Sequence, residues 1–297
     1  MSSADIFDAI SVEAKRFLEQ DPCNLMWGEG KAWVETGEKF WMTPLLGVAS
    51  GDDPIFESFL KPEIGDERMW TPKMAFKEGG FDAEAKDLSV IAWILPHNPA
   101  TLVDNASESA MPSERWVRSR IMGEKANVKL RDRLVELARS LGVDAVAPMN
   151  LPTWTRLQSE RRVYVSNWSE RHAAHACGLG TFGLCDGLIT PVGKAVRIGS
   201  IVLRARLAPT QRPYSRYDEY CPFKTDKKCG ACISRCPAGA LSENGHDKRK
   251  CHGYLHGDTE RYVEERFGFK GYGCGLCQTG VPCSSRIPPS GKDKAAR

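Results

Sequence analysis

The pattern of apolar positions predicts alternating helices and strands over roughly the first 210 residues. Residues 4–19 repeat apolar side chains at helical spacing and predict an amphipathic helix that ends before Pro22. The continuous apolar run 88–95, stopped by a proline, is typical of a buried strand. Residues 23–87 are rich in Trp, Gly and Pro, and they indicate short strands and long loops.

The middle of the chain predicts a long helix followed by a strand. Four leucines between Leu130 and Leu141 recur at helical spacing, in a helix that we expect to begin at Ser113. Gly142 supplies a stop for this helix. Residues 143–147 then predict the next strand.

The segment after residue 168 predicts a short helix and a hairpin. An Ala-rich helix runs from Ser169 to Cys177, and a glycine follows it. Residues 184–205 predict a hairpin that turns near 191–193 and continues as the strand 197–203. Because helices and strands alternate in this way, we expect an α+β fold.

Composition narrows the class of protein without identifying it. The chain has 297 residues, of which 41% are hydrophobic and 27% charged, as in ordinary globular proteins. No run approaches the roughly 18 apolar residues that a membrane span needs. The N-terminus has neither a basic segment nor twin arginines, so we expect a cytoplasmic protein without a membrane partner.

Cysteines are the most informative residues of the chain. Eight of the eleven fall between residues 221 and 283, and such crowding in a reducing compartment favours metal over disulfides. The run from Cys229 to Pro237 has the form C-x2-C-x3-C-P, which resembles the runs of ferredoxins with two [4Fe–4S] clusters. We expect the other three, Cys23, Cys177 and Cys185, to be small buried side chains.

The ferredoxin pattern assigns four thiolates to each cluster, with the cysteine before proline crossing to the neighbouring cluster. The first cluster is then held by Cys221, Cys229, Cys232 and Cys283, and the second by Cys236, Cys251, Cys274 and Cys277. Two gaps between these cysteines are longer than in simple ferredoxins, and inserted loops account for them. A pair of zinc sites is the alternative, since C-x2-C pairs also bind zinc.

The region that carries these cysteines is mildly basic. Residues 213–297 contain 15 Lys and Arg against 10 Asp and Glu. The first 212 residues contain the other 26 Lys and Arg against 28 Asp and Glu. A basic iron–sulfur region suits docking of an acidic electron donor such as ferredoxin or flavodoxin. The same charges also offset the negative charge of thiolate-rich clusters, and the sequence does not separate these two interpretations.

Residues 171–183 read Arg-His-Ala-Ala-His-Ala-Cys-Gly-Leu-Gly-Thr-Phe-Gly. Together with the downstream cysteines, this segment resembles the epoxyqueuosine reductase and reductive dehalogenase superfamily. The resemblance implies a nitroreductase-like α/β domain that binds a corrinoid (cobalamin) and substrate, over residues 1–210. It also implies a two-cluster ferredoxin-like domain over residues 211–297.

The resemblance also implies residues of the cofactor site. Glycines after the Ala-rich helix allow the backbone to approach a flat macrocycle, although a helix cap explains them equally well. The implied cofactor-binding residues are Trp168, His172, His175, Gly178, Gly180, Gly183, Arg197, His252 and Tyr254. Residues 163–168 lack the acidic proton donor of epoxyqueuosine reductases, so Tyr164 is the candidate catalytic acid, with simple strand packing as its alternative.

These observations predict a corrinoid-dependent iron–sulfur reductase that cleaves a small organic substrate, with electrons passing through two clusters to cobalt. Two alternatives stay open: an epoxyqueuosine reductase acting on tRNA, and an electron-transfer protein or corrinoid activator without its own cobalamin. The net charge of +3 and the lack of a basic run interleaved with aromatics led us to expect no nucleic-acid partner.

Overall fold

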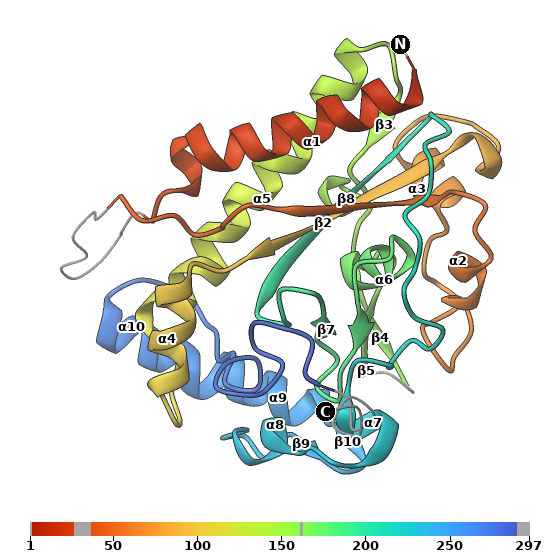
Figure 1. Cartoon of the computed structure of the whole chain (residues 1–297). Helices are drawn as coiled ribbons and strands as arrows, with labels where there is room; N and C mark the ends of the chain where they lie inside the picture. The colour runs from red at the N-terminus through yellow and green to blue at the C-terminus, as the bar shows by residue number, and fades with distance from the viewer. Residues whose placement is uncertain (1, 27–36, 161–162, 290–297) are drawn as a thin grey trace.

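A four-stranded antiparallel sheet forms the centre of the protein (Figure 1). The computed structural model describes residues 2–26, 37–160 and 163–289. The strand order is β1-β2-β8-β3, with bounds Leu45–Ser50, Ser89–Pro96, Val196–Leu203 and Ala145–Val146. Seven of the eight residues of β2 are buried, because β2 pairs on both edges and both of its faces are covered. This burial explains the continuous apolar run that predicted the strand.

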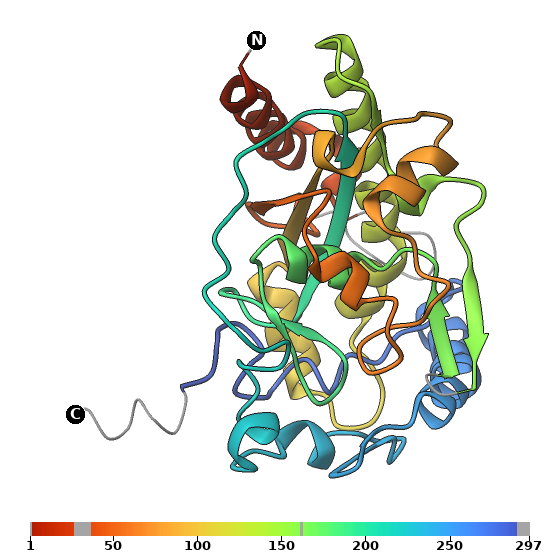
Figure 2. The same cartoon turned by 90° about the vertical axis from the view of Figure 1, so that its right-hand side faces the viewer.

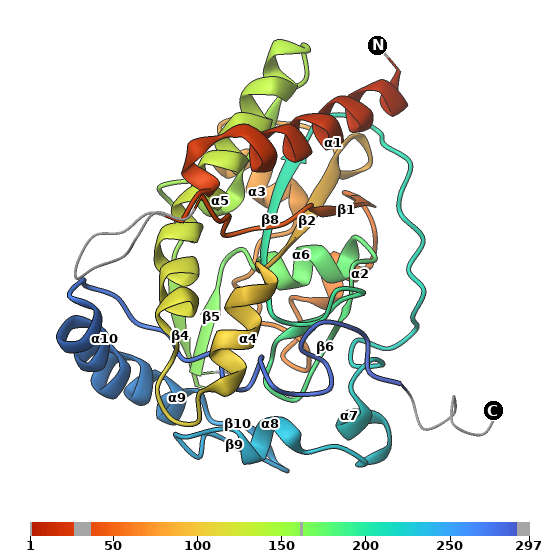
Figure 3. The same ribbon diagram turned by 60° about the vertical axis from the view of Figure 1, so that its left-hand side comes forward.

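Alternate residues of β2 face two separate cores. Ile91, Trp93 and Leu95 pack with α1 (Ser3–Gln20) and α5 (Glu114–Ser140), which cover one face of the sheet (Figure 3). The residues between them pack on the opposite face with α2, α3 and α6 (Ile55–Ser58, Pro72–Glu78 and Glu170–Ala176). Side chains of a strand alternate between faces, so one strand anchors both layers of helices.

The two long helices begin and end as the sequence predicts. The helix predicted over residues 4–19 is confirmed as α1. The backbone N–H of Trp116 donates a hydrogen bond of 3.3 Å to the Ser113 hydroxyl, so Ser113 caps α5. Gly142 follows α5 with φ of +79°, a conformation that favours glycine. Among the described residues, none of the helices combines the length and the apolar character needed to cross a bilayer.

The hairpin predicted over residues 184–205 is wrong in its pairing. Strand β7 (Leu188–Ile189) pairs with β6 (Thr181–Phe182), whereas β8 pairs with β2 and β3. The expected tight turn does form, with reciprocal backbone hydrogen bonds between Thr190 and Gly193. The apolar residues of β8 gain more burial in the central sheet than beside the short β7.

The remaining elements connect or flank these layers. Strands β4 (Arg156–Ser159) and β5 (Val163–Ser166) form a separate hairpin beside the C-terminal helices (Figure 2). Helix α4 covers Pro99–Ser107, and short 3-10 turns lie at Pro22–Asn24, Ala85–Asp87 and Pro148–Asn150.

The cysteine-rich C-terminal segment lies at one end of the sheet (Figure 1). Its elements are α7, α8, β9, β10, α9, a π-helix η4 and α10, with bounds Pro222–Asp226, Ala231–Ser234, Leu241–Ser242, Gly245–His246, Lys248–Tyr254, Leu255–Thr259 and Glu260–Phe267. The α+β class is therefore confirmed for the chain. The domain boundary at residue 210 stays a prediction.

Backbone hydrogen bonds join this segment to the upstream part of the chain. The N–H groups of Lys194 and Ala195 donate to the carbonyl oxygens of Cys283 and Ser284, at 2.9 and 3.2 Å. Gly193 packs so closely here that an added Cβ would lie 2.1 Å from the Ser284 oxygen. The turn after β7 thus fixes the position of a candidate cluster ligand.

Replacing Gly47 by alanine is expected to destabilise the upstream fold by about 1–3 kcal/mol. Gly47 lies in β1, and its added Cβ would stand 2.3 Å from the carbonyl oxygen of Cys177, so β1 and the end of α6 would have to separate. The control is Gly253→Ala in α9, where nothing lies within 4 Å of the new Cβ. Urea unfolding of both variants, followed by tryptophan fluorescence, measures the difference. Equal midpoints for the two would contradict the packing argument.

Candidate cofactor site

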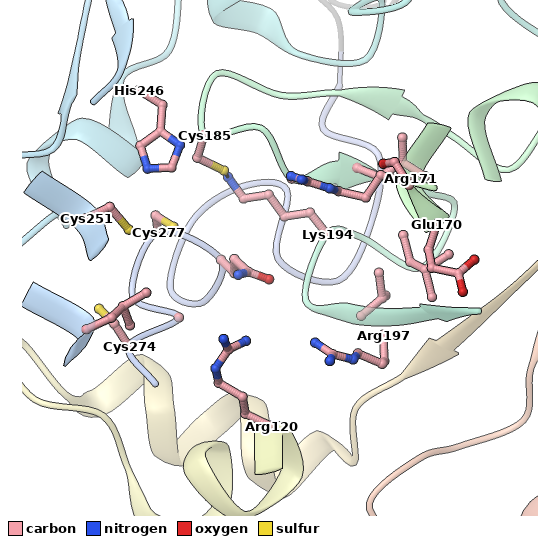
Figure 4. A pocket seen from close by; sticks show the side chains of 18 of the residues that line it. Arg120, Glu170, Arg171, Cys185, Lys194, Arg197, His246, Cys251, Cys274 and Cys277 are labelled. Atoms are coloured by element: carbon pink, nitrogen blue, oxygen red, sulfur yellow. Dashed lines mark hydrogen bonds between the residues drawn. The ribbon is translucent and has the colours of Figure 1, made fainter. Parts of the chain in front are cut away.

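A cavity of about 440 Å³ lies where the central sheet meets the cysteine-rich segment. Five thiols line this main cavity: those of the four candidate ligands Cys236, Cys251, Cys274 and Cys277, and that of Cys185. Basic side chains from α5 and β8 enter from the other side, where Arg120 and Arg197 point inward (Figure 4). Thiols and positively charged side chains therefore line the same cavity.

Cys232 and Cys274, one from each expected set of ligands, have different thiol neighbours. Burial, followed by nearby thiols that include Cys283 and Cys221, raises the pKa of Cys232 to about 12. Cys229 packs against the small core that contains Cys221, Cys232 and Cys283, and so do Cys236 and Cys277 of the other expected set. Burial, followed by Cys251 and Cys236, raises the pKa of Cys274 to about 11.

Zinc is the alternative to clusters for these thiols. Within the described parts of the chain, no three His, Cys, Asp or Glu side chains converge on one point as the ligands of a single ion do. A zinc ion needs four donors at about 2.0–2.3 Å. Thiolates of a cubane cluster each bind a different iron atom, so they stand farther apart. The assignment of these thiols to clusters instead of zinc stays a prediction.

Lys194 is a buried cation between these thiols and the main cavity. Its Nζ donates a hydrogen bond of 3.3 Å to Cys185 Sγ, and its side chain is almost fully buried. Burial alone would lower the pKa of Lys194, but the charges of Cys185 and Cys283 raise it, so the ammonium form is retained. Cys185 also interacts with Cys277, and it therefore joins the candidate ligands as a ninth thiol.

A buried ion network supports the cavity wall. Arg131 donates to Glu170 at 3.0 Å and to Glu124 at 3.2 Å, and Glu124 also pairs with Arg197. Burial raises the pKa of Glu170, whose carboxylate also accepts from Ser200. In Figure 4 this carboxylate turns away from the middle of the cavity. The network positions Arg197 and offers no free acid to a ligand.

Aromatic rings line another part of the main cavity. His97 lies between Trp41 and Trp116, with ring centroids 4.6 Å from each. Burial, with the charge of Arg197 as second cause, lowers the pKa of His97 to about 3, so the imidazole is neutral. Its buried Nδ1 has no hydrogen-bond partner. A polar ligand is the natural partner for such an atom.

A second cavity of about 240 Å³ shares residues with the first, among them Arg156 and Arg171. Tyr164, His172 and Gly183 line this second cavity. The Tyr164 ring stacks at 5.1 Å on His252, and its carbonyl oxygen accepts from Lys248 Nζ at 3.1 Å.

Three of the sequence-predicted cofactor residues line the main cavity, namely Trp168, Arg197 and Tyr254. Trp168 is held by a hydrogen bond of 3.0 Å from its Nε1 to Ser200 Oγ. His252 lines neither cavity and stacks between Tyr164 and His256.

Gly178, Gly180 and His175 also lie outside both cavities. Gly178 has φ of +79° after α6, as a helix-ending glycine does, and a Cβ on Gly180 would collide with Ile189. His175 Nδ1 hydrogen-bonds the Gly180 oxygen at 2.7 Å. Packing and hydrogen bonding within the fold explain why these residues stand at these positions. Their contact with a corrinoid stays a prediction.

Sequence reasoning missed most of the charged residues at the cavity. Arg120, Arg131, Arg156, Glu170 and Lys194 come from four separate segments, none with a motif around it. Only the pairing of β2 with β8, and of residues 194–195 with 283–284, brings them together.

The residues present fit the implied cofactors. Two expected sets of cysteines with a buried ammonium group suit anionic clusters, since positive charge offsets that of the thiolates. The main cavity offers aromatic surface and two buried polar atoms without partners, His97 Nδ1 and Arg120 Nε. A large polar cofactor such as a corrinoid would satisfy them.

Comparison with known proteins gives one consistent group of relatives. No protein-family model matches the chain. An epoxyqueuosine reductase of Aliivibrio fischeri is 43% identical over 60 residues, which are 18% of this chain and 16% of that protein. Another, from Francisella cf. novicida, is 32% identical over 126 residues, or 40% of this chain and 33% of that one. The matches thus span only a minor part of each relative.

Solved structures share the fold. An epoxyqueuosine reductase in complex with a tRNA-Tyr stem loop modified with epoxyqueuosine has a TM-score of 0.50 at 16% identity, over 95% of this chain and 66% of that one. A catabolic reductive dehalogenase variant has a TM-score of 0.50 at 14% identity, over 84% and 31%. The resemblance inferred from the sequence is confirmed, and the curated relatives are named as oxidoreductases.

We expected a small-molecule substrate and no nucleic-acid partner, and the comparison with epoxyqueuosine reductases contradicts this expectation. The epoxyqueuosine reductase of similar fold is seen with a tRNA stem loop. The physical reason is that net charge averages over the whole surface. The two cavities gather Arg and Lys side chains that the total of +3 conceals: Arg120, Arg131, Arg156, Arg171, Lys194, Arg197, Lys224 and Lys248.

Proposed function

We propose that this chain is an iron–sulfur- and corrinoid-dependent reductase of the epoxyqueuosine reductase type, acting on a modified base carried by tRNA. The observation that carries this proposal is the main cavity, with candidate cluster thiols on one side and arginines on the other. The similarity to epoxyqueuosine reductases supports it. A nitroreductase-like upstream domain and a ferredoxin-like downstream domain are part of the proposal.

In this proposal the two sets of cysteines define a route for electrons, from the cluster away from the cavity to the cluster beside it. Cys236, Cys251, Cys274 and Cys277 line the main cavity, so the cluster they hold stands next to the reaction space. Cys221, Cys229, Cys232 and Cys283 hold the other cluster, away from that cavity. The cluster held by Cys221, Cys229, Cys232 and Cys283 would accept electrons from an external donor, and the cluster beside the cavity would supply them to the reaction space.

The cavity residues hold the cofactor and the substrate. A bound corrinoid supplies a strongly reducing cobalt centre in this space. Trp168, Arg197 and Tyr254 line its walls, and the neutral His97 offers a hydrogen bond to a polar side group. Tyr164 lines the adjoining cavity, and in this proposal it gives a proton to the substrate. Removing an epoxide oxygen as water consumes two electrons and two protons.

The experiment uses protein purified and reconstituted without oxygen, supplied with cobalamin and a chemical reductant. We expect conversion of an epoxyqueuosine-modified tRNA stem loop to the deoxygenated product, detected by mass spectrometry as loss of one oxygen atom. Tyr164→Phe should slow the reaction, and the matched control Tyr262→Phe, on α10, should leave it unchanged. Uptake of iron and cobalamin without any turnover of the stem loop would contradict the tRNA substrate. Iron without cobalamin binding would contradict the reductase itself.

Replacing Lys194 by methionine is expected to lower the reduction potential of at least one cluster. The buried ammonium group lies among the thiols, and removing one positive charge at about 6 Å changes the energy of an added electron by on the order of 100 mV at an effective dielectric constant of about 20. Lys194→Arg keeps the charge and should retain most of the potential. A redox titration followed by EPR measures both. Equal potentials in wild type and Lys194→Met would exclude this electrostatic role.

A further inference from the structure

The basic residues around the main cavity differ in whether a carboxylate neutralises them. Arg131 and Arg197 pair with acidic residues of the buried network, and Lys194 bonds to a thiol. Arg120 and Arg156 form no salt bridge with any residue in the described parts of the chain. The buried Nε of Arg120 also has no hydrogen-bond partner.

Arg120 and Arg156 both interact with Tyr272. Arg120 stacks over the Tyr272 ring, with its guanidinium carbon 4.6 Å from the centroid. Burial raises the pKa of Tyr272, but the charges and hydrogen bonds of Arg120 and Arg156 lower it further than burial raises it. The ring is supported from behind by His256, with centroids 4.2 Å apart. Arg120 is therefore held in one direction, into the cavity (Figure 4).

The third cation of this wall is Arg197. Burial lowers the pKa of Arg120, and the charges of Arg197 and Arg156 lower it further, which shows that the three guanidinium groups are close enough to repel one another. Like charges gathered at low dielectric cost free energy unless an anion lies between them. Glu124 and Glu170 balance the charges of Arg131 and Arg197, so the excess positive charge on this side of the cavity comes from Arg120 and Arg156.

We infer that Arg120, Arg156 and Arg197 form a phosphate-binding subsite in the wall of the main cavity. Guanidinium groups bind phosphate oxygens through paired N–H donors, and the three that line this cavity come from α5, β4 and β8. The inference rests on the proposed function. Two sources carry the same phosphodiester chemistry: the nucleotide part of the corrinoid, and the backbone of the tRNA next to the modified base.

Equilibrium binding to the cluster-reconstituted chain separates these sources. The probes are cobalamin, cobinamide (which lacks the nucleotide and its phosphodiester) and the tRNA stem loop. The variants are Arg120→Met and Arg156→Met, and Arg156 is exposed, so its replacement leaves the core intact. Arg133→Met, a charge removal on the exposed side of α5, is the control.

If the phosphate belongs to the corrinoid, the affinity of both variants for cobalamin should fall by at least about tenfold, whereas their affinity for cobinamide should stay unchanged. If it belongs to the RNA, stem-loop affinity should fall by about tenfold, and the slope of log affinity against log salt should decrease by about one for each arginine removed. Equal weakening of cobalamin and cobinamide, or affinities equal to those of Arg133→Met, would overturn the subsite. A wild-type chain that binds none of the three probes would instead refute the proposed function.

Discussion

Replacing Cys274 by alanine is expected to remove one whole cluster, so that iron falls from about eight to about four atoms per chain. Cys274 lies with Cys236 and Cys251, apart from the ninth thiol, Cys185. No spare thiol therefore stands beside it to take its place. Because this cluster borders the main cavity, reductase activity should be lost as well.

The control for this prediction is Cys23→Ala. Cys23 is half-buried beside the core formed by α1 and α5, far in the structure from the other thiols. Iron analysis and EPR of the reduced proteins measure both variants. Full iron content in Cys274→Ala, or the same loss in Cys23→Ala, would show that the cysteines are not grouped as we propose. Cys277→Ala is the informative third variant, because Cys185 stands next to Cys277 and could replace it as ligand.

Replacing Arg131 by methionine is expected to lower the free energy of unfolding by about 3 kcal/mol, because it leaves the buried carboxylate of Glu170 without its cation. The Arg131 side chain is 1% exposed, and that of Glu170 is 9% exposed. Arg133→Met, on the same helix, removes an ion pair whose arginine is 44% exposed, and it should cost under about 1 kcal/mol. Denaturant unfolding measures both, and equal losses would contradict the difference in burial.

The Arg131 variant should also show a pH signature. Burial already raises the pKa of Glu170 above its ordinary value of 4.5, and losing Arg131 raises this pKa further. A carboxyl group with a higher pKa in the folded state stabilises the fold while it is protonated and loses this contribution as pH rises through that pKa. The deficit against wild type should therefore grow as pH rises above the ordinary carboxyl pKa of 4.5. A deficit that is constant with pH would mean that Glu170 does not titrate in the variant.

Elements with a strong periodic pattern could be predicted from the sequence, because burial of one face dictates their residues. Helices α1 and α5 and strand β2 are of this kind. The pairing of β7 could not be predicted, since a two-residue strand carries too little pattern to outweigh the partners of β8. Strand β1 and helices α2 and α3 lie where Trp, Gly and Pro obscure any period.

The candidate site divides in the same way. The candidate cluster cysteines can be recognised from their spacing, because ligands that come from one turn of the chain follow one another closely in sequence. Lys194 and Arg120 have no such local constraint, and their positions depend on contacts between segments far apart in the chain. Net charge misled the expectation about nucleic acid for a related reason, since it records how many charges exist and not where the fold gathers them.

Two hydrogen bonds join residues 283–284 to residues 194–195. A cluster bound to Cys283 would attach the same segment a second time, and it would therefore help to maintain the structure. Cys221 and Cys283 stand about sixty residues apart in sequence, so a cluster that joins them closes a large loop, as a covalent cross-link does. Loss of such a cluster would open this loop and leave residues 283–287 attached through the backbone hydrogen bonds and the packing of Ile287. We therefore expect proteases to cut the described segment around Cys283 faster in protein whose clusters have been oxidised.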